Sequence, residues 1–271
     1  MFGVSLGIKV GNSNISGGGF DADAQAYFSR VTTAGGTLTT TERNAVNQLV
    51  IDMKANGTWT AMKAIYPMVG SSAAACAQNL KSSSFTGSFS SGWTFESTGV
   101  TGNGTSAYMD SFFVPSTNLT QNSTHLSCYL NTNNVGGVNA LTMGVLFNGT
   151  LDSILLNQES LTLNTRNLNS LISSVQSTRL GFAITSKTSA TITTLYKNGT
   201  SVASGNSGGL LSNVIYKIFL ACLNNTGNAN PGSFSNNRIA FASIGDGLTD
   251  TQASNFYTAV QAFQTTLSRN V

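Results

Sequence analysis

The residue types that usually carry out catalysis are scarce in this chain. Among its 271 residues there are one histidine, seven aspartates and three glutamates, which are Glu42, Glu96 and Glu159. No glutamate has an acidic neighbour within two positions, whereas glycoside hydrolysis needs two carboxyl groups about 5 to 9.5 Å apart. The histidine, His125, lies in the stretch NSTHLSCYL, which lacks a nucleophile elbow, and we interpret it as a strand residue. We therefore expect no catalytic residues.

The residues that could hold a metal ion are also poorly placed. Cys76, Cys128 and Cys222 are far apart in the sequence and form no C-x-x-C motif. A zinc site built from them and His125 is disfavoured, because His125 and Cys128 would point to opposite faces of a strand. We interpret the cysteines as buried thiols and expect no metal, no cofactor and no disulfide framework.

Composition excludes several other classes of protein. Charged residues make up 8% of the chain, against about a quarter in an average domain, while 40% are apolar. This combination favours a folded chain with a neutral surface rich in hydroxyl and amide groups. The 13 basic residues form no cluster, so nucleic acid is not an expected partner. No apolar window is long enough to span a membrane, and the first residues do not resemble a cleaved signal.

Residues 2–10 alternate strictly between apolar and other residues, which predicts a strand with one apolar side. Its apolar side consists of Phe2, Val4, Leu6, Ile8 and Val10. The following GNSNISGGG allows a flexible link, so residues 1–19 are either an arm that adds to a partner's sheet or the first strand of the protein's own sheet.

Residues 20–75 have the spacing of a small helical subdomain. Asp21 can cap a first short helix, and Thr39 with Glu42 forms a capping box before a second helix. A third short helix is expected over residues 58–66, because Thr58 can cap it and its apolar residues have helical spacing; Pro67 would end it. Another capping box, GLTDTQ, predicts a C-terminal helix over residues 249–271 that packs on the body of the protein.

Residues 76–248 predict a β-sandwich. Short runs rich in Val, Ile, Thr, Tyr and Phe alternate with Gly and Asn, and no long helix interrupts them. The pairs Asn148-Gly149 and Asn198-Gly199 predict tight antiparallel hairpins. Strands are expected at 92–97, 106–114, 124–130, 141–147, 150–156, 160–165, 179–187, 190–197, 200–204, 214–223 and 238–244. Such a series predicts a two-sheet antiparallel sandwich.

Several stretches resemble a known family. TGNGTSAYMDSFFVPSTNLTQNSTHLSCYL, LYKNGTSVASG and RIAFASIGDGLTDTQASNFYTAVQAF are similar to successive parts of laminin G-like, concanavalin A-like jelly rolls, over residues 92–263. WTAMKAIYPMVG and IGDGLTDTQASNFYTAVQAFQTTL resemble structural proteins of bacteriophage virions that carry such a domain. The resemblance implies a jelly-roll sandwich on the virion surface, with other virion proteins and further copies of the chain as partners.

The family includes glycan binders, glucanases and inert interaction modules, so the resemblance does not decide the activity. The E-x-D-x-E pattern of its glucanases is missing. Some members bind calcium through loop oxygens, but the candidates Asp110, Asp152 and Asp246 are isolated carboxylates without a D-x-D-x-D loop. We therefore expect a protein that is not an enzyme and holds no calcium.

A glycan would be recognised by aromatic faces and amide groups in exposed loops. The loops 131–139 and 224–237 have this composition, and Trp93, Tyr108 and Phe112 are predicted to be core residues of alternating strands instead. The candidate glycan-binding residues are Asn133, Asn134, Asn225, Asn228, Asn230 and Phe234.

Three hypotheses follow for the function. The first is a non-enzymatic virion protein, in a capsid, spike or tail fibre, whose lectin-like domain faces outward and attaches to host glycans. The alternative is a carbohydrate-binding module of a bacterial surface or secreted system. An enzyme with an unusual site is the third.

Overall fold

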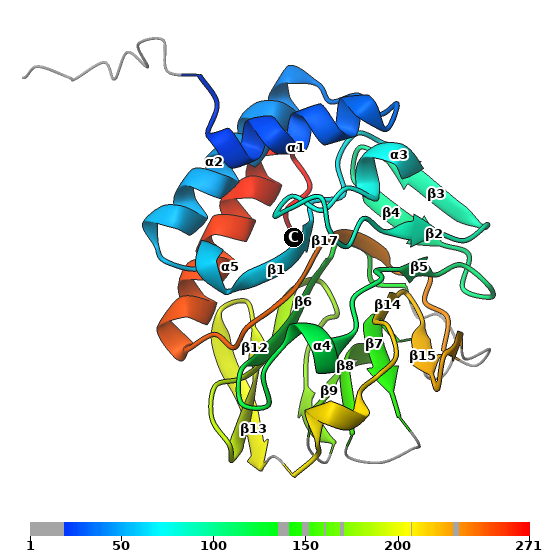
Figure 1. Ribbon diagram of the computed structural model, residues 1–271, viewed down its shortest axis with the longest axis vertical. Helices are drawn as coiled ribbons and strands as arrows, with labels where there is room; N and C mark the ends of the chain where they lie inside the picture. Colours follow the sequence, from blue (N-terminus) through cyan, green and yellow to red (C-terminus); the bar gives the residue numbers. More distant parts are fainter. Residues whose placement is uncertain are drawn as a thin grey trace, which may run out of the picture.

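Two facing β-sheets and a layer of helices form the described part of the chain (Figure 1). The computed structural model describes residues 19–134, 141–147, 152–159, 161–168, 171–206, 208–229 and 233–271. The predicted mainly β, two-sheet antiparallel sandwich with helices near both ends of the chain is confirmed. The predicted docking residues Phe2, Val4, Leu6, Ile8 and Val10, and the pair Asn148-Gly149, lie outside the described residues.

The first sheet, sheet A, has the strand order β13-β12-β11-β6-β17-β4-β3. β1 and β4 pair with the same edge of β17, β1 near its C-terminal end and β4 near its N-terminal end. Asn198 and Gly199 join β12 to β13 with φ angles of 46° and 76°, which confirms this predicted hairpin. The strands of sheet A are β1 (Met62–Tyr66), β3 (Trp93–Glu96), β4 (Gly99–Gly102), β6 (Thr124–Leu130), β11 (Gly181–Lys187), β12 (Ile192–Lys197), β13 (Thr200–Asn206) and β17 (Arg238–Gly245).

The second sheet, sheet B, has the strand order β10-β9-β8-β7-β14-β5-β2, with a small β15–β16 hairpin attached to β7. Its strands are β2 (Ser88–Phe89), β5 (Met109–Asp110), β7 (Met143–Leu146), β8 (Ser153–Glu159), β9 (Thr162–Asn167), β10 (Ile172–Val175), β14 (Phe219–Leu220), β15 (Leu223–Asn225) and β16 (Asn228–Ala229). The predicted strands over 106–114 and 214–223 are much shorter here, since only Met109 and Asp110 of the former and Phe219, Leu220 and Leu223 of the latter are in ladders.

The helices begin where their caps predict. Thr39 and Thr249 each form the expected capping box, with Glu42 and Gln252 respectively, and the Asp21 side chain accepts from the amide of Asp23. The helices are α1 (Ala22–Thr33), α2 (Thr40–Ala55), α3 (Ala73–Cys76), α4 (Pro115–Asn118) and α5 (Asp250–Thr266), with the short 3₁₀ helices η1 (Trp59–Ala61) and η2 (Leu211–Asn213). No helix of the described residues is both long and apolar enough to cross a bilayer.

Two hydrophobic cores hold the three layers together. One lies between the sheets, and the other lies between sheet A and the helices α1, α2 and α5. In the second core, the ring of Phe256 on α5 lies 5.2 Å from that of Phe182 on β11 and 5.9 Å from that of Phe241 on β17. The helices therefore cover the outer face of sheet A, as expected for the apolar stripe of the C-terminal helix. Whether residues 20–75 form a unit of their own stays a prediction.

The predicted third helix over residues 58–66 is wrong. This segment forms η1 and then strand β1, which pairs with β17 from Met62↔Gly245 to Tyr66↔Ala242. Ile65 faces the helices while Ala64 and Tyr66 face the second sheet, so both sides of β1 are buried. A strand buried on both faces shows no polar alternation, and its apolar spacing therefore also fits a helix.

Candidate functional site

The outer face of sheet B carries a hollow of about 230 Å³. Along its strands the residues alternate: Met109 and Leu220 point into the core between the sheets, and their neighbours Asp110 and Phe219 point outward. We call this site the outer hollow. It is lined by Asp110, Val114, Ile215, Tyr216, Lys217, Phe219, Asn224 and Gly227. The free face of the sandwich thus bears a concave site, whereas helices occupy the corresponding face of sheet A.

An ion pair lies at the outer hollow. The Lys217 ammonium is 2.9 Å from Oδ2 of Asp110 and 4.2 Å from the centre of the Phe112 ring. The other carboxylate oxygen of Asp110 accepts a 2.7 Å hydrogen bond from the amide of Phe112. Phe112 itself is 46% exposed and has a φ angle of 56°, so the prediction that it is a core strand residue is wrong. Its left-handed backbone turns the chain out of β5 and brings the ring to the surface.

Aromatic rings continue this surface. Tyr108 stacks on Phe219, with ring centres 4.6 Å apart and planes inclined by 25°. The Tyr216 ring lies 6.2 Å from that of Phe147 and packs directly on Gly227. A Cβ atom at Gly227, whose φ is 93°, would approach this ring to 3.1 Å, so a glycine best fits the turn there. Tyr108 is only partly buried, and Trp93, the third predicted core aromatic, is also only partly buried.

The β15–β16 hairpin brings one of the two predicted loops to the outer hollow. Buried Asn224 donates to the carbonyl oxygen of Lys217 at 2.8 Å and accepts from the amide of Gly227 at 2.9 Å. These bonds hold the hairpin against the lining. The side chains of Asn225 and Asn228 have no hydrogen-bond partner within the described residues and are available to a ligand. Asn230, the next predicted residue, lies outside the described residues.

The other predicted residues form a separate group. The amide of Asn134 donates to Oδ1 of Asn237 at 3.0 Å, and its side chain donates to the carbonyl oxygen of Asn236 at 2.9 Å. Oδ1 of Asn133 accepts from the amide of Arg179 at 3.2 Å. These bonds join the loop at 131–134 to the segments at 179 and 236–237, so Asn133 and Asn134 are engaged within the protein. Phe234 is half-buried and is not among the residues that line the outer hollow.

Tyr216, Lys217 and Phe219 are not among the predicted site residues, because their sequence was interpreted as one continuous strand over 214–223. One usable signal is the charged lysine in the apolar run VIYKIF, which is unexpected in a strand buried on both faces. The outer hollow combines aromatic faces, amides and one ion pair. Asp110 is the only carboxylate among the described lining residues, and its two oxygens accept from the Lys217 ammonium and from the backbone amide of Phe112. Such a set can stack on a ligand and form hydrogen bonds with it.

The candidate metal residues do not come together within the described chain, where no group of three His, Cys, Asp or Glu side chains could hold an ion. Asp110 pairs with Lys217, Asp152 accepts from the amide of Leu210, and Asp246 pairs with Lys63. Cys76, Cys128 and Cys222 are buried free thiols, as predicted. Burial raises the pKa of Cys76 to about 12, so this thiol stays protonated.

His125 is a buried strand residue, as predicted. Nδ1 lies 2.6 Å from the carbonyl oxygen of Asp246, and Nε2 lies 3.0 Å from the hydroxyl of Ser243. It faces Phe256 on the helical side of sheet A, whereas Cys128 faces the core between the sheets. Burial lowers the pKa of His125 to about 4, so the ring is neutral at pH 7.

No family model and no curated protein matches this chain. Among solved structures, domain 4 of the extracellular arabinanase AbnA from Geobacillus stearothermophilus, in complex with arabinotriose, is 12% identical with a TM-score of 0.47, covering 72% of this chain and 98% of that one. The NanB sialidase of Streptococcus pneumoniae is 16% identical with a TM-score of 0.44, covering 54% of this chain and 26% of NanB.

The CBM40 of a Ruminococcus gnavus sialidase, bound to sialyllactose, is 16% identical with a TM-score of 0.35, covering 47% of this chain and 78% of that one. This chain spans about a quarter of the length of the NanB structures it matches. Likenesses at this level do not carry a function to this chain.

Proposed function

We propose that this chain is a non-enzymatic binding module that recognises a neutral glycan at the outer hollow. The observation that supports the proposal is that aromatic, charged and amide groups lie together on the outer face of sheet B. These are the rings of Tyr216 and Phe112, the Asp110–Lys217 pair and the amides of the β15–β16 hairpin. Sugars present apolar C–H faces that pack on aromatic rings, and hydroxyl groups that bond to amides and charged groups.

The electrostatics favour a neutral ligand. The only charged groups in the lining are Lys217 and Asp110, and each neutralises the other across 2.9 Å. The pair can still bond to sugar hydroxyls, with the ammonium as a donor and the carboxylate as an acceptor. Hydrolysis by a pair of carboxyl groups would need a second acid, and the lining of the outer hollow contains only Asp110.

Binding to a glycan array, with product analysis of any bound sugar, tests this function. We expect Tyr216→Ala and Lys217→Met each to weaken binding about tenfold, roughly 1.4 kcal/mol, through loss of a ring face or a donor. Val175→Ala changes an exposed residue of β10 in the same sheet and should leave binding unchanged. Equal binding by all variants would place the site elsewhere, a cleaved sugar would indicate an enzyme, and no binding to any glycan would exclude a lectin.

A virion surface is the setting we propose for this module. Its support is the resemblance of residues 59–70 and 244–267 to phage structural proteins, and these stretches adjoin through the pairing of β1 with β17. The helix α1, which follows the N-terminal arm, lies in the helical layer (Figure 1). The outer hollow is lined by residues of sheet B and its loops. Attachment through the N-terminal arm would therefore leave the outer hollow free for a host glycan.

Deletion of residues 1–19 tests this attachment. We expect the shortened chain to stay folded, because it retains every residue of the two described cores, and to be lost from purified particles of the assembly. Circular dichroism and mass spectrometry of the particles measure the two effects. Unfolding of the shortened chain would show that the arm belongs to the core. Glycan binding without any assembly partner would favour the alternative, a carbohydrate-binding module of a bacterial surface or secreted system.

A further inference from the structure

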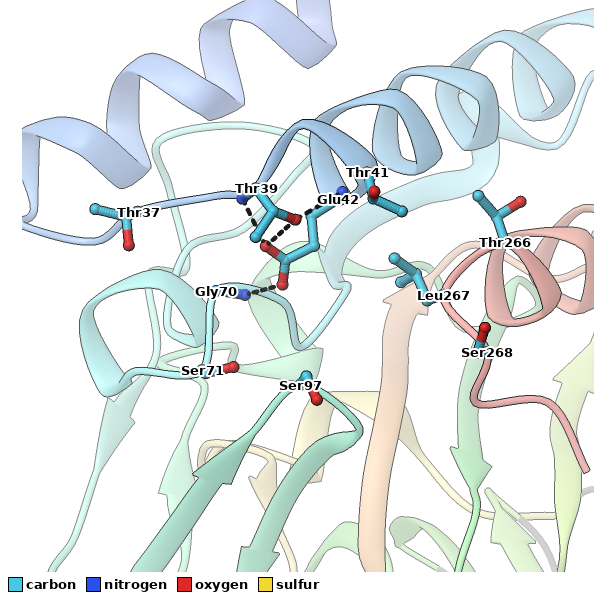
Figure 2. A pocket seen from close by; sticks show the side chains of 10 residues that line it. All are labelled: Thr37, Thr39, Thr41, Glu42, Gly70, Ser71, Ser97, Thr266, Leu267 and Ser268. Carbon is cyan, nitrogen blue, oxygen red and sulfur yellow. Dashed lines mark hydrogen bonds between the residues drawn. The ribbon is translucent and has the colours of Figure 1, made fainter.

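A second hollow lies where the helical layer meets the turns of sheet A (Figure 2). It has a volume of about 360 Å³, at the lower end of the range of small-molecule sites. Seven of its ten lining residues are serine or threonine, and we call it the hydroxyl pocket. The lining residues are Thr37, Thr39, Thr41, Glu42, Gly70, Ser71, Ser97, Thr266, Leu267 and Ser268.

Most of these hydroxyl groups are available to a ligand. Thr39 is bonded to Glu42, and Thr266 donates to the carbonyl oxygen of Ala262. The side chains of the other five have no hydrogen-bond partner within the described residues. These are Thr37, Thr41, Ser71, Ser97 and Ser268. Each hydroxyl can both donate and accept, which matches the hydroxyl groups of a polyol or sugar.

The one charged side chain of the hydroxyl pocket is already engaged. Oε2 of Glu42 accepts from the amide and the hydroxyl of Thr39 at 2.8 and 3.0 Å, and Oε1 accepts from the amide of Gly70 at 2.7 Å (Figure 2). Glu42 also lies in the first turn of α2, where the helix dipole stabilises a negative charge. No cationic side chain lines the pocket, so it does not favour an anion.

Close packing and buried hydrogen bonds hold the walls of the hydroxyl pocket in place. Gly70 has a φ angle of 83°, and a Cβ atom there would lie 2.5 Å from the Ala75 side chain and 2.6 Å from the carbonyl oxygen of Thr37. On the other side, Arg269 donates to the carbonyl oxygens of Pro67 and Met68 and so ties the end of α5 to the turn before Gly70. A rigid site loses little entropy on binding.

We propose that the hydroxyl pocket is a second ligand site, which binds a neutral mono- or disaccharide independently of the outer hollow. The free hydroxyl groups would replace the hydration of the sugar's own hydroxyls, and Leu267 offers an apolar contact for a C–H face. Among the described lining residues there is a single carboxylate and no aromatic ring, so hydrogen bonds rather than ring stacking would hold the sugar.

Nuclear magnetic resonance of the full chain tests this site residue by residue. Glucose, arabinose and maltose are the probes, and we expect saturable shifts of the backbone amides of Gly70, Ser71, Ser97 and Ser268 with at least one of them. Ser97→Trp, in the β3–β4 turn, fills the pocket and should weaken binding at least tenfold. Ser91→Trp is the matched control, an exposed serine in the turn before β3, and should bind normally.

Tyr216→Ala separates this proposal from the proposed function. It should leave the shifts around Ser97 unchanged, because Tyr216 lines only the outer hollow. No saturable shift of these four amides with any probe, or equal binding by Ser97→Trp, would overturn the second site. Either result would leave glycan binding at the outer hollow to be judged by its own variants.

Discussion

Replacing Arg269 with methionine should lower the free energy of unfolding by about 4 kcal/mol. The guanidinium is only 3% exposed and makes four hydrogen bonds, to the carbonyl oxygens of Pro67, Met68 and Ala240 and to Oε1 of Gln264. Methionine fills similar space but leaves several buried acceptors without donors, and each such group costs about 1 to 3 kcal/mol.

Arg269 remains charged in the folded protein. Burial lowers its pKa to about 10, and the nearby carboxylate of Glu42 opposes this shift. Arg269→Lys keeps the charge but cannot reproduce the planar fork of donors, so we expect an intermediate loss of stability.

Urea unfolding of the three proteins measures these effects. Lys63→Met is the control, since it removes the half-exposed ion pair with Asp246 and should cost at most about 1 kcal/mol. A loss for Arg269→Met no larger than that of Lys63→Met would show that the buried hydrogen bonds contribute little to stability.

Local signals in the sequence predict most of the fold. The capping boxes at Thr39 and Thr249 and the Asn198-Gly199 turn depend on residues within four positions of each other, so spacing alone identifies them. β1 was predicted as a helix, and the reason for this error is physical. Its residues bury both faces, one against helices and the other against sheet B, and only the tertiary partners decide between strand and helix.

The candidate sites are harder to predict for the same reason. Asp110 and Lys217 are 107 positions apart, and a turn with a left-handed residue, Phe112, completes their site. The predicted asparagines of the amide-rich loops differ in their hydrogen bonding. Asn225 and Asn228 have side chains without a partner among the described residues, while Asn133 and Asn134 bond to neighbouring loops. Composition cannot separate these two uses, because the same amide groups serve both. The hydroxyl pocket is formed by four segments that are far apart in the sequence, and none of them has a binding motif of its own.

Lowering the pH from 7.5 to 5 should destabilise the protein through His125 by about 2 kcal/mol. The ring is completely buried between sheet A and α5, and burial lowers its pKa to about 4, against about 6.5 in an unfolded chain. Between these two values the unfolded chain binds a proton that the folded protein does not. The contribution of the neutral ring is therefore complete above pH 6.5 and is lost progressively as the pH falls towards 4.

The chain suits this measurement because His125 is its only histidine. Urea unfolding at several pH values between 5 and 7.5 gives the slope of the free energy of unfolding against pH. The single imidazole signal in a proton spectrum gives the pKa of His125 directly. Asp246 accepts from the ring only through its backbone carbonyl, and its carboxylate pairs with Lys63. Lys63→Met therefore serves as the control for the neighbouring ion pair and should leave the slope intact.

His125→Gln should be less stable at pH 7.5, since it fits the bonds to Asp246 and Ser243 imperfectly, but its stability should change little down to pH 5. The smaller pH dependence of the free energy of unfolding is the decisive result. A general loss of packing would lower this free energy by the same amount at every pH. An unchanged slope in His125→Gln, or an imidazole that titrates near pH 6.5 in the folded protein, would contradict a histidine kept neutral by burial.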